Sequence, residues 1–243
     1  MAASALAVLL HLPIAFAHTG NTPVISPHLN STNTGTSNPM AVYSKSAALL
    51  MYDSIGLQNA GLSFEAFEYA MYGYQQLRDK GRLSNKNIIT IVDFSQASNK
   101  KRLYVIDLSA SKILFNTYVA HGQNTGREFA KQFSNRAESH QSSLGFYVTS
   151  GTYMGSNGFS MYLNGMERGI NDNAMNRAIV MHGADYVSEQ MIRSQGYIGR
   201  SHGCPAVPLK WNKAIIAKIK NGSCLFVYSN NSTYLRKSKL LNS

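Results

Sequence analysis

A histidine and a cysteine, each next to a glycine, are the residues of this chain whose types and order could do chemistry. His182 and Gly183 begin one stretch, and Gly203 and Cys204 end it. A free thiol is mostly protonated at neutral pH, and the thiolate is the nucleophile. A nearby imidazole can take the thiol proton and leave a thiolate–imidazolium pair. The sequence therefore predicts nucleophilic catalysis by Cys204, with His182 as the general base.

The surroundings of the two residues suit the same chemistry. Gly203 has no side chain, so backbone amides can approach a reacting carbonyl there without obstruction. The N–H groups of Gly203 and Cys204 could then face the oxyanion of a tetrahedral intermediate. The apolar run before His182 predicts a buried strand with the histidine at its end, and loops that follow rigid elements commonly carry reactive groups.

Two other interpretations of these residues are open. Cys204 could be a small core residue, and His182 could be a histidine with its hydrogen bonds satisfied at a strand end. Alternatively, His182, His202 and Cys204 offer ligand atoms for a metal, but the last two do not have the usual zinc spacing. The joint occurrence of both residues and both glycines favours catalysis. We therefore expect no metal and no organic cofactor.

The motif around these residues resembles a known family. The order His-Gly, spacer, Ser-His-Gly-Cys resembles the signature of the L,D-transpeptidases, cysteine enzymes that remodel murein. The continuation Cys-Pro-Ala-Val resembles a divergent branch, because the commoner branch has an Arg where this chain has Ala206. The resemblance extends more weakly from Asn87 to Tyr228, and it implies a β-sandwich catalytic core.

The resemblance implies a reaction. Cys204 would attack the carbonyl that joins the diamino acid of a peptidoglycan stem to its terminal D-Ala, with His182 as base and then acid. The Gly183 carbonyl would hold the other imidazole nitrogen. An amine from a second stem would make a cross-link, whereas water would make the protein an L,D-carboxypeptidase. A non-catalytic cell-wall binding module is the contrasting class. Carbapenem β-lactams are expected to acylate Cys204.

The resemblance also implies residues around the nucleophile. A tyrosine hydroxyl near the oxyanion is typical of the family, and Tyr162 and Tyr153 are the candidates, with Gly203 as the backbone donor. Arg200 and Ser201 could meet the substrate carboxylate in place of the missing Arg. The full set of expected substrate contacts is Ser201, His202, Arg200 and His121.

Composition and charge limit the classes to which this protein can belong. The 243 residues are 44% hydrophobic and 14% charged, which allows a packed core. The net charge of +11 suits an anionic partner, but no nucleic-acid motif accompanies it, so we expect no nucleic acid. Cys204 and Cys224 are too few for a disulfide scaffold, and a bond between them would consume the nucleophile.

The N-terminal part predicts export from the cytoplasm. Residues 1–17 are apolar and end in a small-x-small pattern, as a signal peptide does, and this run is too short to span a membrane. Residues 18–40 are rich in Asn, Thr, Ser and Pro and predict a flexible linker. Together with the resemblance, this places the protein in the periplasm or cell envelope.

The remaining elements predict a mainly β domain with accessory helices, an α+β fold. Residues 41–86 predict N-terminal helices packed on the core, the second of them with Ser63 as N-cap. Residues 87–230 predict the catalytic domain, and 231–243 predict a solvated basic tail. Strands are expected at 88–92, 103–108, 113–120, 142–148, 159–163, 178–181 and 224–228, and helices at 184–194 and 209–220.

Overall fold

The computed structural model describes residues 39–242. Its elements are, in chain order, α1 (Pro39–Ile55), α2 (Phe64–Asp79), β1 (Ile88–Asp93), β2 (Leu103–Asp107), β3 (Lys112–Thr117), β4 (Gly145–Gly155), β5 (Gly158–Gly165), β6 (Val180–Ala184), α3 (Glu189–Gln195), β7 (Ala206–Pro208), α4 (Leu209–Ile219), β8 (Cys224–Tyr228) and α5 (Ser232–Lys237). The predicted mainly β fold with accessory helices is confirmed. Within these residues, no helix combines the length and the apolar character needed to cross a membrane.

The expectations for the N-terminal part fall mostly on residues that the structure does not describe. The signal peptide expected at 1–17 lies entirely outside the described residues, as does the linker expected at 18–40 except for its last two positions. Those two positions belong to α1, which begins at Pro39.

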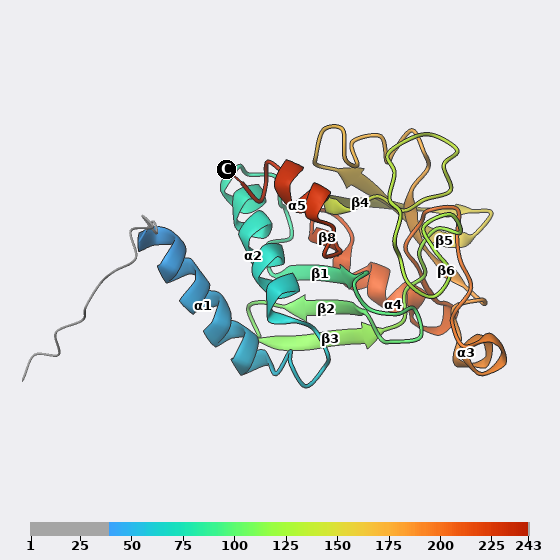
Figure 1. The fold of residues 1–243 in the computed structure, drawn as a ribbon, viewed down its shortest axis with the longest axis horizontal. Coiled ribbons are helices and arrows are strands. Elements are labelled where there is room, and N and C mark those ends of the chain that lie inside the picture. The colour runs from blue at the N-terminus through green and yellow to red at the C-terminus, as the bar shows by residue number, and fades with distance from the viewer. Residues whose placement is uncertain (1–38, 243) are drawn as a thin grey trace, which may run out of the picture. The chain divides into compact units, whose positions relative to one another are not determined.

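One bent sheet organises the described residues. Its eight strands have the order β3-β2-β1-β8-β4-β5-β6-β7. β1 pairs in parallel with β8, β6 pairs in parallel with β7, and the other neighbours pair antiparallel. Figure 1 shows β1, β2 and β3 side by side, with β5 and β6 turned away at the other end of the sheet. The last three strands, β5 to β7, carry the candidate site.

Local sequence explains the elements that form the core. Every residue of β1 and β8 is buried, as expected for apolar runs in the middle of a sheet. α2 begins at its predicted N-cap, where the Ser63 hydroxyl accepts a hydrogen bond from the Ala66 amide, and Glu65 lies in the positive first turn. The buried face of α2 packs on β1 and β8.

The C-terminal segment differs from the solvated tail that the sequence predicts. It contains α5, and the buried carboxylate of Glu167 holds it by accepting hydrogen bonds from Tyr234 at 3.1 Å and from Ser238. The same carboxylate accepts a hydrogen bond from the Phe146 amide at 2.7 Å. Burial raises the pKa of Glu167, so these bonds are needed to satisfy the group. Arg236 is exposed, as a basic tail would be.

Two expectations next to the site are corrected. β6 continues through Ala184, so His182 lies within a strand and not at its end. The helix expected at 184–194 begins only at Glu189, because Ala184 is still paired with Pro208 and Ser188 is the N-cap. The apolar periodicity in this segment does not distinguish the end of the strand and the following turn from the start of a helix.

Candidate active site

Three neighbouring strands place candidate residues on one face of the sheet. In the β5–β6 pair, Ser160 lies opposite His182 and Tyr162 lies opposite Val180. In the β6–β7 pair, His182 lies opposite Ala206. Paired residues point to the same side of a sheet, and alternate residues of a strand share a face. Tyr162 and His182 therefore belong to one face.

The other face of these strands belongs to the core. Met161, Met181 and Val207 are fully buried in the main hydrophobic cluster. The face of His182 is covered by a separate apolar cluster of Ala120, Ala184, Val187, Ile198 and Ala206. His182 is 4% exposed under this cover, whereas Tyr162 is 36% exposed. The site therefore has a shielded histidine and a more open tyrosine.

The loop before the cysteine is held by hydrogen bonds among its own residues. The Ser201 hydroxyl accepts a hydrogen bond from the Gly203 amide at 3.0 Å and donates to the Cys204 carbonyl at 2.7 Å. Gly203 has φ of +120°, a conformation that side chains disfavour. A Cβ at Gly203 would also lie 2.7 Å from the Gln141 carbonyl oxygen. Glycine is therefore required at this position for two independent reasons.

These bonds engage two residues for which the sequence predicts other roles. The Gly203 amide donates to Ser201, so in this structure it is not a free donor for an oxyanion. Ser201 is 5% exposed, and its hydroxyl is engaged within the loop. The backbone amide of Cys204 lies close to its own sulfur and lowers the thiol pKa.

The Cys204 thiol lies beside the first residue of β6. Its sulfur accepts a hydrogen bond from the Val180 amide at 3.5 Å and donates to the Ala178 carbonyl at 3.6 Å. Burial raises the thiol pKa, while the Val180 amide and the charge of Arg177 act in the opposite direction. Tyr162 is paired with Val180 across the sheet. The sulfur therefore lies at the same level along the strands as Tyr162.

The His182 ring is oriented by the backbone. Nδ1 lies 3.0 Å from the Gly183 carbonyl oxygen, and a carbonyl can only accept, so Nδ1 carries the proton. Nε2 then has a lone pair and makes no hydrogen bond within residues 39–242. Burial lowers the pKa of His182, which keeps the ring neutral. A neutral imidazole with a fixed tautomer can accept a proton at Nε2.

Gly183 also has a packing role that its place in the motif does not reveal. A Cβ at Gly183 would lie 2.9 Å from Asn212 and 3.0 Å from Leu209. Glycine at this position therefore lets α4 pack closely on β6, directly after the histidine.

No hydrogen bond joins His182 to Cys204 within the described part of the chain; the thiol bonds to the backbone at the start of β6 instead. Catalytic hydrogen bonds are often long in the absence of substrate and form in the complex. His182 lies opposite Ala206 on β7, and Cys204 lies in the loop two residues before Ala206.

Arg177 is a residue of the site that the sequence did not single out. Its guanidinium donates to the Gln141 carbonyl at 2.6 Å and to the Ser143 hydroxyl at 2.6 Å. A Cβ at Gly203 would lie 3.3 Å from one of its nitrogens. No carboxylate pairs with Arg177 in residues 39–242, and its charge lowers the pKa of Cys204. No local pattern could identify it, because its partners lie far away in the sequence.

Tyr186 is a second such residue. Burial raises the pKa of Tyr186 to about 12, and the negative charge of a nearby Cys204 thiolate contributes to the rise. Gly199 accommodates the ring, because a Cβ there would lie 2.5 Å from Tyr186. The sequence could have indicated Tyr186 as a site residue, because it follows His182 closely and lies inside the motif.

His121, expected to contact substrate, has a different place. It is fully buried, and its Nδ1 lies 2.7 Å from Arg102 Nη2 while Nε2 lies 3.1 Å from the Gly126 carbonyl oxygen. Burial, followed by the charge of Arg102, lowers the pKa of His121 to about 3. Both ring nitrogens are thus used inside the protein, and the expected substrate contact is wrong.

The remaining candidates lie on the surface near the loop. Arg200 is exposed, with Nη1 3.4 Å from the carbonyl oxygens of Gln123 and Gly126. His202 is exposed and stacks on His140, with ring centroids 4.3 Å apart. Within residues 39–242, no three or more His, Cys, Asp or Glu side chains gather where they could hold a metal ion. Tyr153 stacks on Tyr162 with centroids 4.5 Å apart.

Solved structures similar to this chain include three L,D-transpeptidases. One is from Mycobacterium smegmatis, with 12% identity, coverage of 59% of each chain and a TM-score of 0.36. Another is a complex with imipenem, with 14% identity, coverage of 58% of this chain and 59% of that chain, and a TM-score of 0.36. The third is from Stackebrandtia nassauensis, with 16% identity, coverage of 78% and 79%, and a TM-score of 0.36. The chain thus spans less than two thirds of the first two.

A comparison with sequence families is more decisive. No curated protein matches the chain. The sequence model of the L,D-transpeptidase catalytic domain matches residues 58–228, which is more than two thirds of the chain. This match includes α2, the whole sheet and the loop that carries Cys204. The chain therefore belongs to the L,D-transpeptidase catalytic domain family.

Proposed function

We propose that this protein is a cysteine acyl-transferase that cross-links tetrapeptide stems of peptidoglycan through a thioester on Cys204. The observation that carries the proposal is the arrangement on one sheet face of a neutral, oriented His182, the Cys204 thiol and Tyr162. Membership of the L,D-transpeptidase family supports the reaction class. No cofactor is needed for this chemistry.

In the first half-reaction, Nε2 of His182 takes the thiol proton, and the sulfur of Cys204 attacks the carbonyl carbon between the diamino acid and the terminal D-Ala. The carbonyl oxygen becomes negative as the tetrahedral intermediate forms. Collapse of this intermediate breaks the C–N bond, and the imidazolium gives its proton to the leaving D-Ala amine. The remaining tripeptide is then bound to Cys204 as a thioester.

In the second half-reaction, the amine of another stem attacks the thioester while His182 takes a proton from that amine. The carbon–sulfur bond breaks, the thiol is regenerated with the same proton, and a new amide joins the two stems. Water in place of the amine would release a tripeptide and make the protein a carboxypeptidase. His182 acts as base and acid in both cases.

Other residues stabilise charge in this proposal. The Cys204 amide and the Tyr162 hydroxyl are the donors for the oxyanion, since the Gly203 amide is engaged by Ser201. Arg177 stabilises the thiolate, since it lies beside the loop without an acidic partner. Arg200 is the exposed cation that is available to a substrate carboxylate, where the commoner family pattern has Arg in place of Ala206. His202 lines the same opening.

The domain boundaries and location are part of the proposal. We assign the catalytic domain to 87–230 and the helices that support it to 41–86. The apolar stretch at 1–17 is proposed as a signal peptide, which would deliver the domain to the periplasm or cell envelope, where murein is found.

The test is product analysis of murein fragments. Purified tetrapeptide stems are incubated with the protein, and products are separated and weighed by mass spectrometry. A cross-linked dimer with release of D-Ala supports the transferase, and a tripeptide alone would reassign the protein as a carboxypeptidase. No product, combined with a Cys204 thiol that does not react with iodoacetamide, would reassign it as a binding module.

A carbapenem supplies a second test, independent of the natural substrate. A relative has been solved with imipenem, and we propose that the strained amide of this class acylates Cys204 here as well. Intact-protein mass should rise by one carbapenem per chain in the wild type and stay constant in Cys204→Ala. An adduct that persists in Cys204→Ala would show that the carbapenem acylates another residue, and would contradict the assignment of Cys204 as the nucleophile.

A further inference from the structure

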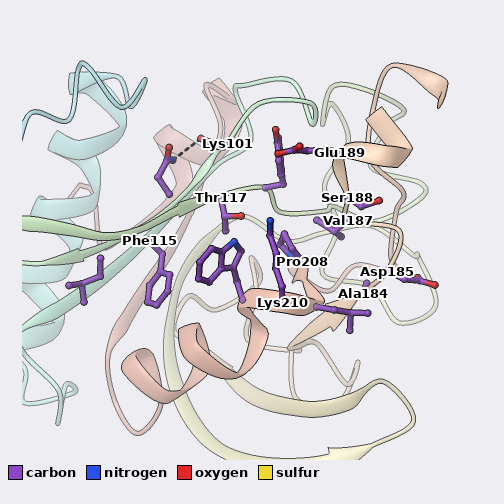
Figure 2. Close-up of a pocket in the computed structure, with 15 residues that line it drawn as sticks. Lys101, Phe115, Thr117, Ala184, Asp185, Val187, Ser188, Glu189, Pro208 and Lys210 are labelled. Atoms are coloured by element: carbon purple, nitrogen blue, oxygen red, sulfur yellow. Dashed lines mark hydrogen bonds between the residues drawn. The ribbon is translucent and has the colours of Figure 1, made fainter. Parts of the chain in front are cut away.

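A cavity of about 580 Å³ lies near the candidate site, between three parts of the chain. β3 supplies Phe115 and Thr117, the connection from β6 to α3 supplies Ser188, and the start of α4 supplies Lys210 and Trp211. Figure 2 shows Phe115, Thr117, Ser188 and Lys210 around one opening. We call it the Trp211 pocket. Its volume is in the range of small-molecule sites, and none of the proposed catalytic residues lines it.

One side of the Trp211 pocket is aromatic. The indole of Trp211 is 42% exposed, which is unusual for a large apolar side chain. Phe115 contacts it edge-on, with ring centroids 6.0 Å apart. Tyr118 lines the same cavity and is half-buried. The pocket thus presents a partly exposed, flat aromatic surface.

The other side is polar and carries both signs of charge. The cations are Lys101 and Lys210, and the anions are Asp185 and Glu189 (Figure 2). None of these four side chains forms an ion pair within residues 39–242. Their charges cancel, so the pocket does not select an anion or a cation. It offers hydrogen-bond donors and acceptors around a flat apolar surface, which suits a neutral molecule with many hydroxyls and apolar ring faces, such as a saccharide.

The pocket lies at a defined place along the sheet. Ala184 and Pro208, which line it, are paired two residues beyond the pair of His182 and Ala206. Val180, whose amide contacts the Cys204 sulfur, lies four residues before Ala184 on β6. At a rise of about 3.3 Å per residue, the pocket begins about 13 Å from the level of the sulfur.

That separation fits a peptidoglycan stem. When the terminal D-Ala leaves, three residues remain between the reacting carbonyl and the sugar that carries the stem. Three extended residues span at most about 10–11 Å, and the link to the sugar adds a little more. A stem whose reacting carbonyl lies at Cys204 is therefore long enough to bring its sugar to the Trp211 pocket.

We propose that the Trp211 pocket binds the saccharide of the glycan strand that carries the stem peptide. A sugar ring stacks on the indole of Trp211, and its hydroxyls bond to Thr117, Lys210 and Glu189. This inference rests on the proposed function, since it names the part of the substrate beyond the stem. The enzyme would then distinguish stems attached to a glycan strand from free peptides.

The test uses saccharide without a stem peptide, so that binding is measured without turnover. Trp211 is the only tryptophan of the chain, so its fluorescence reports on this pocket alone. Oligosaccharides of N-acetylglucosamine and N-acetylmuramic acid should bind saturably in equilibrium dialysis and change the tryptophan emission. Lack of binding in dialysis overturns the inference. Binding of a free stem tetrapeptide at this pocket, in place of the saccharide, also overturns it.

Variants separate the pocket from the fold. Trp211→Ala should weaken saccharide binding by roughly tenfold or more, and Trp211→Phe should weaken it less because a ring remains. Phe129→Ala is the matched control, since Phe129 is an aromatic residue of similar exposure, at 45%, outside the pocket. Equal affinity for the saccharide in Trp211→Ala and Phe129→Ala would contradict the proposal.

A kinetic comparison keeps this inference distinct from the proposed function. Trp211→Ala should raise KM for stems attached to a disaccharide and leave kcat/KM for free tetrapeptides unchanged. Saccharide binding without any acyl transfer would refute the proposed function and leave the pocket assignment intact. Acyl transfer without saccharide binding would refute the pocket assignment and leave the proposed function intact.

Discussion

Two buried histidines of this protein, His182 and His121, have the same side chain and different surroundings. His182 uses only Nδ1, which bonds to the Gly183 carbonyl, and Nε2 is left with a lone pair. His121 uses both nitrogens, one with Arg102 and one with the Gly126 carbonyl. Burial lowers the pKa of both, so both rings are neutral. The difference shows that an unused ring nitrogen, and not burial or neutrality, distinguishes a candidate base from a structural histidine.

The two cysteines repeat this contrast. Cys204 is partly exposed on a loop next to Arg177, whereas Cys224 is fully buried in β8. Burial raises the pKa of both thiols, but only that of Cys204 is also lowered by a nearby cation. The amide of Val180 and the charge of Arg177 thus partly offset the effect of burial on the pKa of Cys204, whereas the pKa of Cys224 is raised by burial and by the charge of Glu167.

The largest expected effect is the loss of the nucleophile. Cys204→Ala should abolish acyl transfer and retain the fold, because the side chain lies on a loop outside the strands. Cys224→Ala is the matched control and should retain turnover, with a stability loss of about 1 kcal/mol from the small cavity. Turnover is measured by D-Ala release, and folding by circular dichroism. D-Ala release by Cys204→Ala at the wild-type rate would end the assignment.

The second effect concerns the base. His182→Ala should lower kcat by roughly a hundredfold or more, because proton transfer by a positioned side chain contributes that much. His202→Ala is the control, since His202 is an exposed residue stacked on His140. Steady-state kinetics on both variants check the prediction. The opposite pattern, with the loss confined to His202→Ala, would show that the base is wrongly assigned.

The third effect tests the structural histidine. His121→Ala should lower the free energy of unfolding by about 2–4 kcal/mol, because it opens a cavity and removes a partner of the fully buried Arg102. Catalysis by the folded fraction should stay near the wild-type rate. Denaturant unfolding and active-site titration measure these quantities. A stable variant with a large loss in kcat would instead return His121 to the catalytic groove.

The same residue has a pH signature. The pKa of His121 is about 3 in the folded protein, against about 6.5 in an unfolded chain. Between these values the unfolded chain binds a proton that the folded chain excludes, so the free energy of unfolding falls as the pH falls from about 6.5 towards 3. His121→Gln should lose this part of the acid sensitivity. Identical pH profiles of stability for wild type and variant would contradict the buried neutral ring.

The smallest effect concerns Arg177. Arg177→Gln removes a positive charge that favours the thiolate, so the thiol pKa of Cys204 should rise. The pH dependence of iodoacetamide labelling measures this pKa, and Arg177→Lys should restore part of the shift. If Arg177 only supports the loop, Gln and Lys variants will label with the same pKa.

Sequence predicted those features that neighbouring residues determine. β8 was expected at 224–228 and is found there, because five successive apolar residues are buried in the middle of the sheet. The N-cap at Ser63 was also correct, since its bond to Ala66 lies within a single helical turn. The motif itself identified Cys204 and His182 as the residues to consider, because their types and flanking glycines indicate one chemistry.

Features that depend on distant contacts were missed or misread. Arg177 contacts a loop more than thirty residues earlier in the chain, so no local pattern pointed to it. His121 was misread because the sequence does not show that Arg102 lies against it. The sequence also does not show that the Ser201 hydroxyl folds back onto the loop and accepts a hydrogen bond from the Gly203 amide. In each case a hydrogen bond between separate segments or within a compact loop decided the outcome.

In the proposed reaction, Cys204 carries the acyl group between the two half-reactions. The most direct measurement is rapid acid quenching of the protein with a tetrapeptide stem and no acceptor, followed by proteolysis and mass spectrometry. A tripeptide acyl group should appear on the peptide that contains Cys204 as D-Ala is released, and it should be lost when an acceptor amine is added. Release of D-Ala by active protein with Cys204 unmodified at every time point would contradict it.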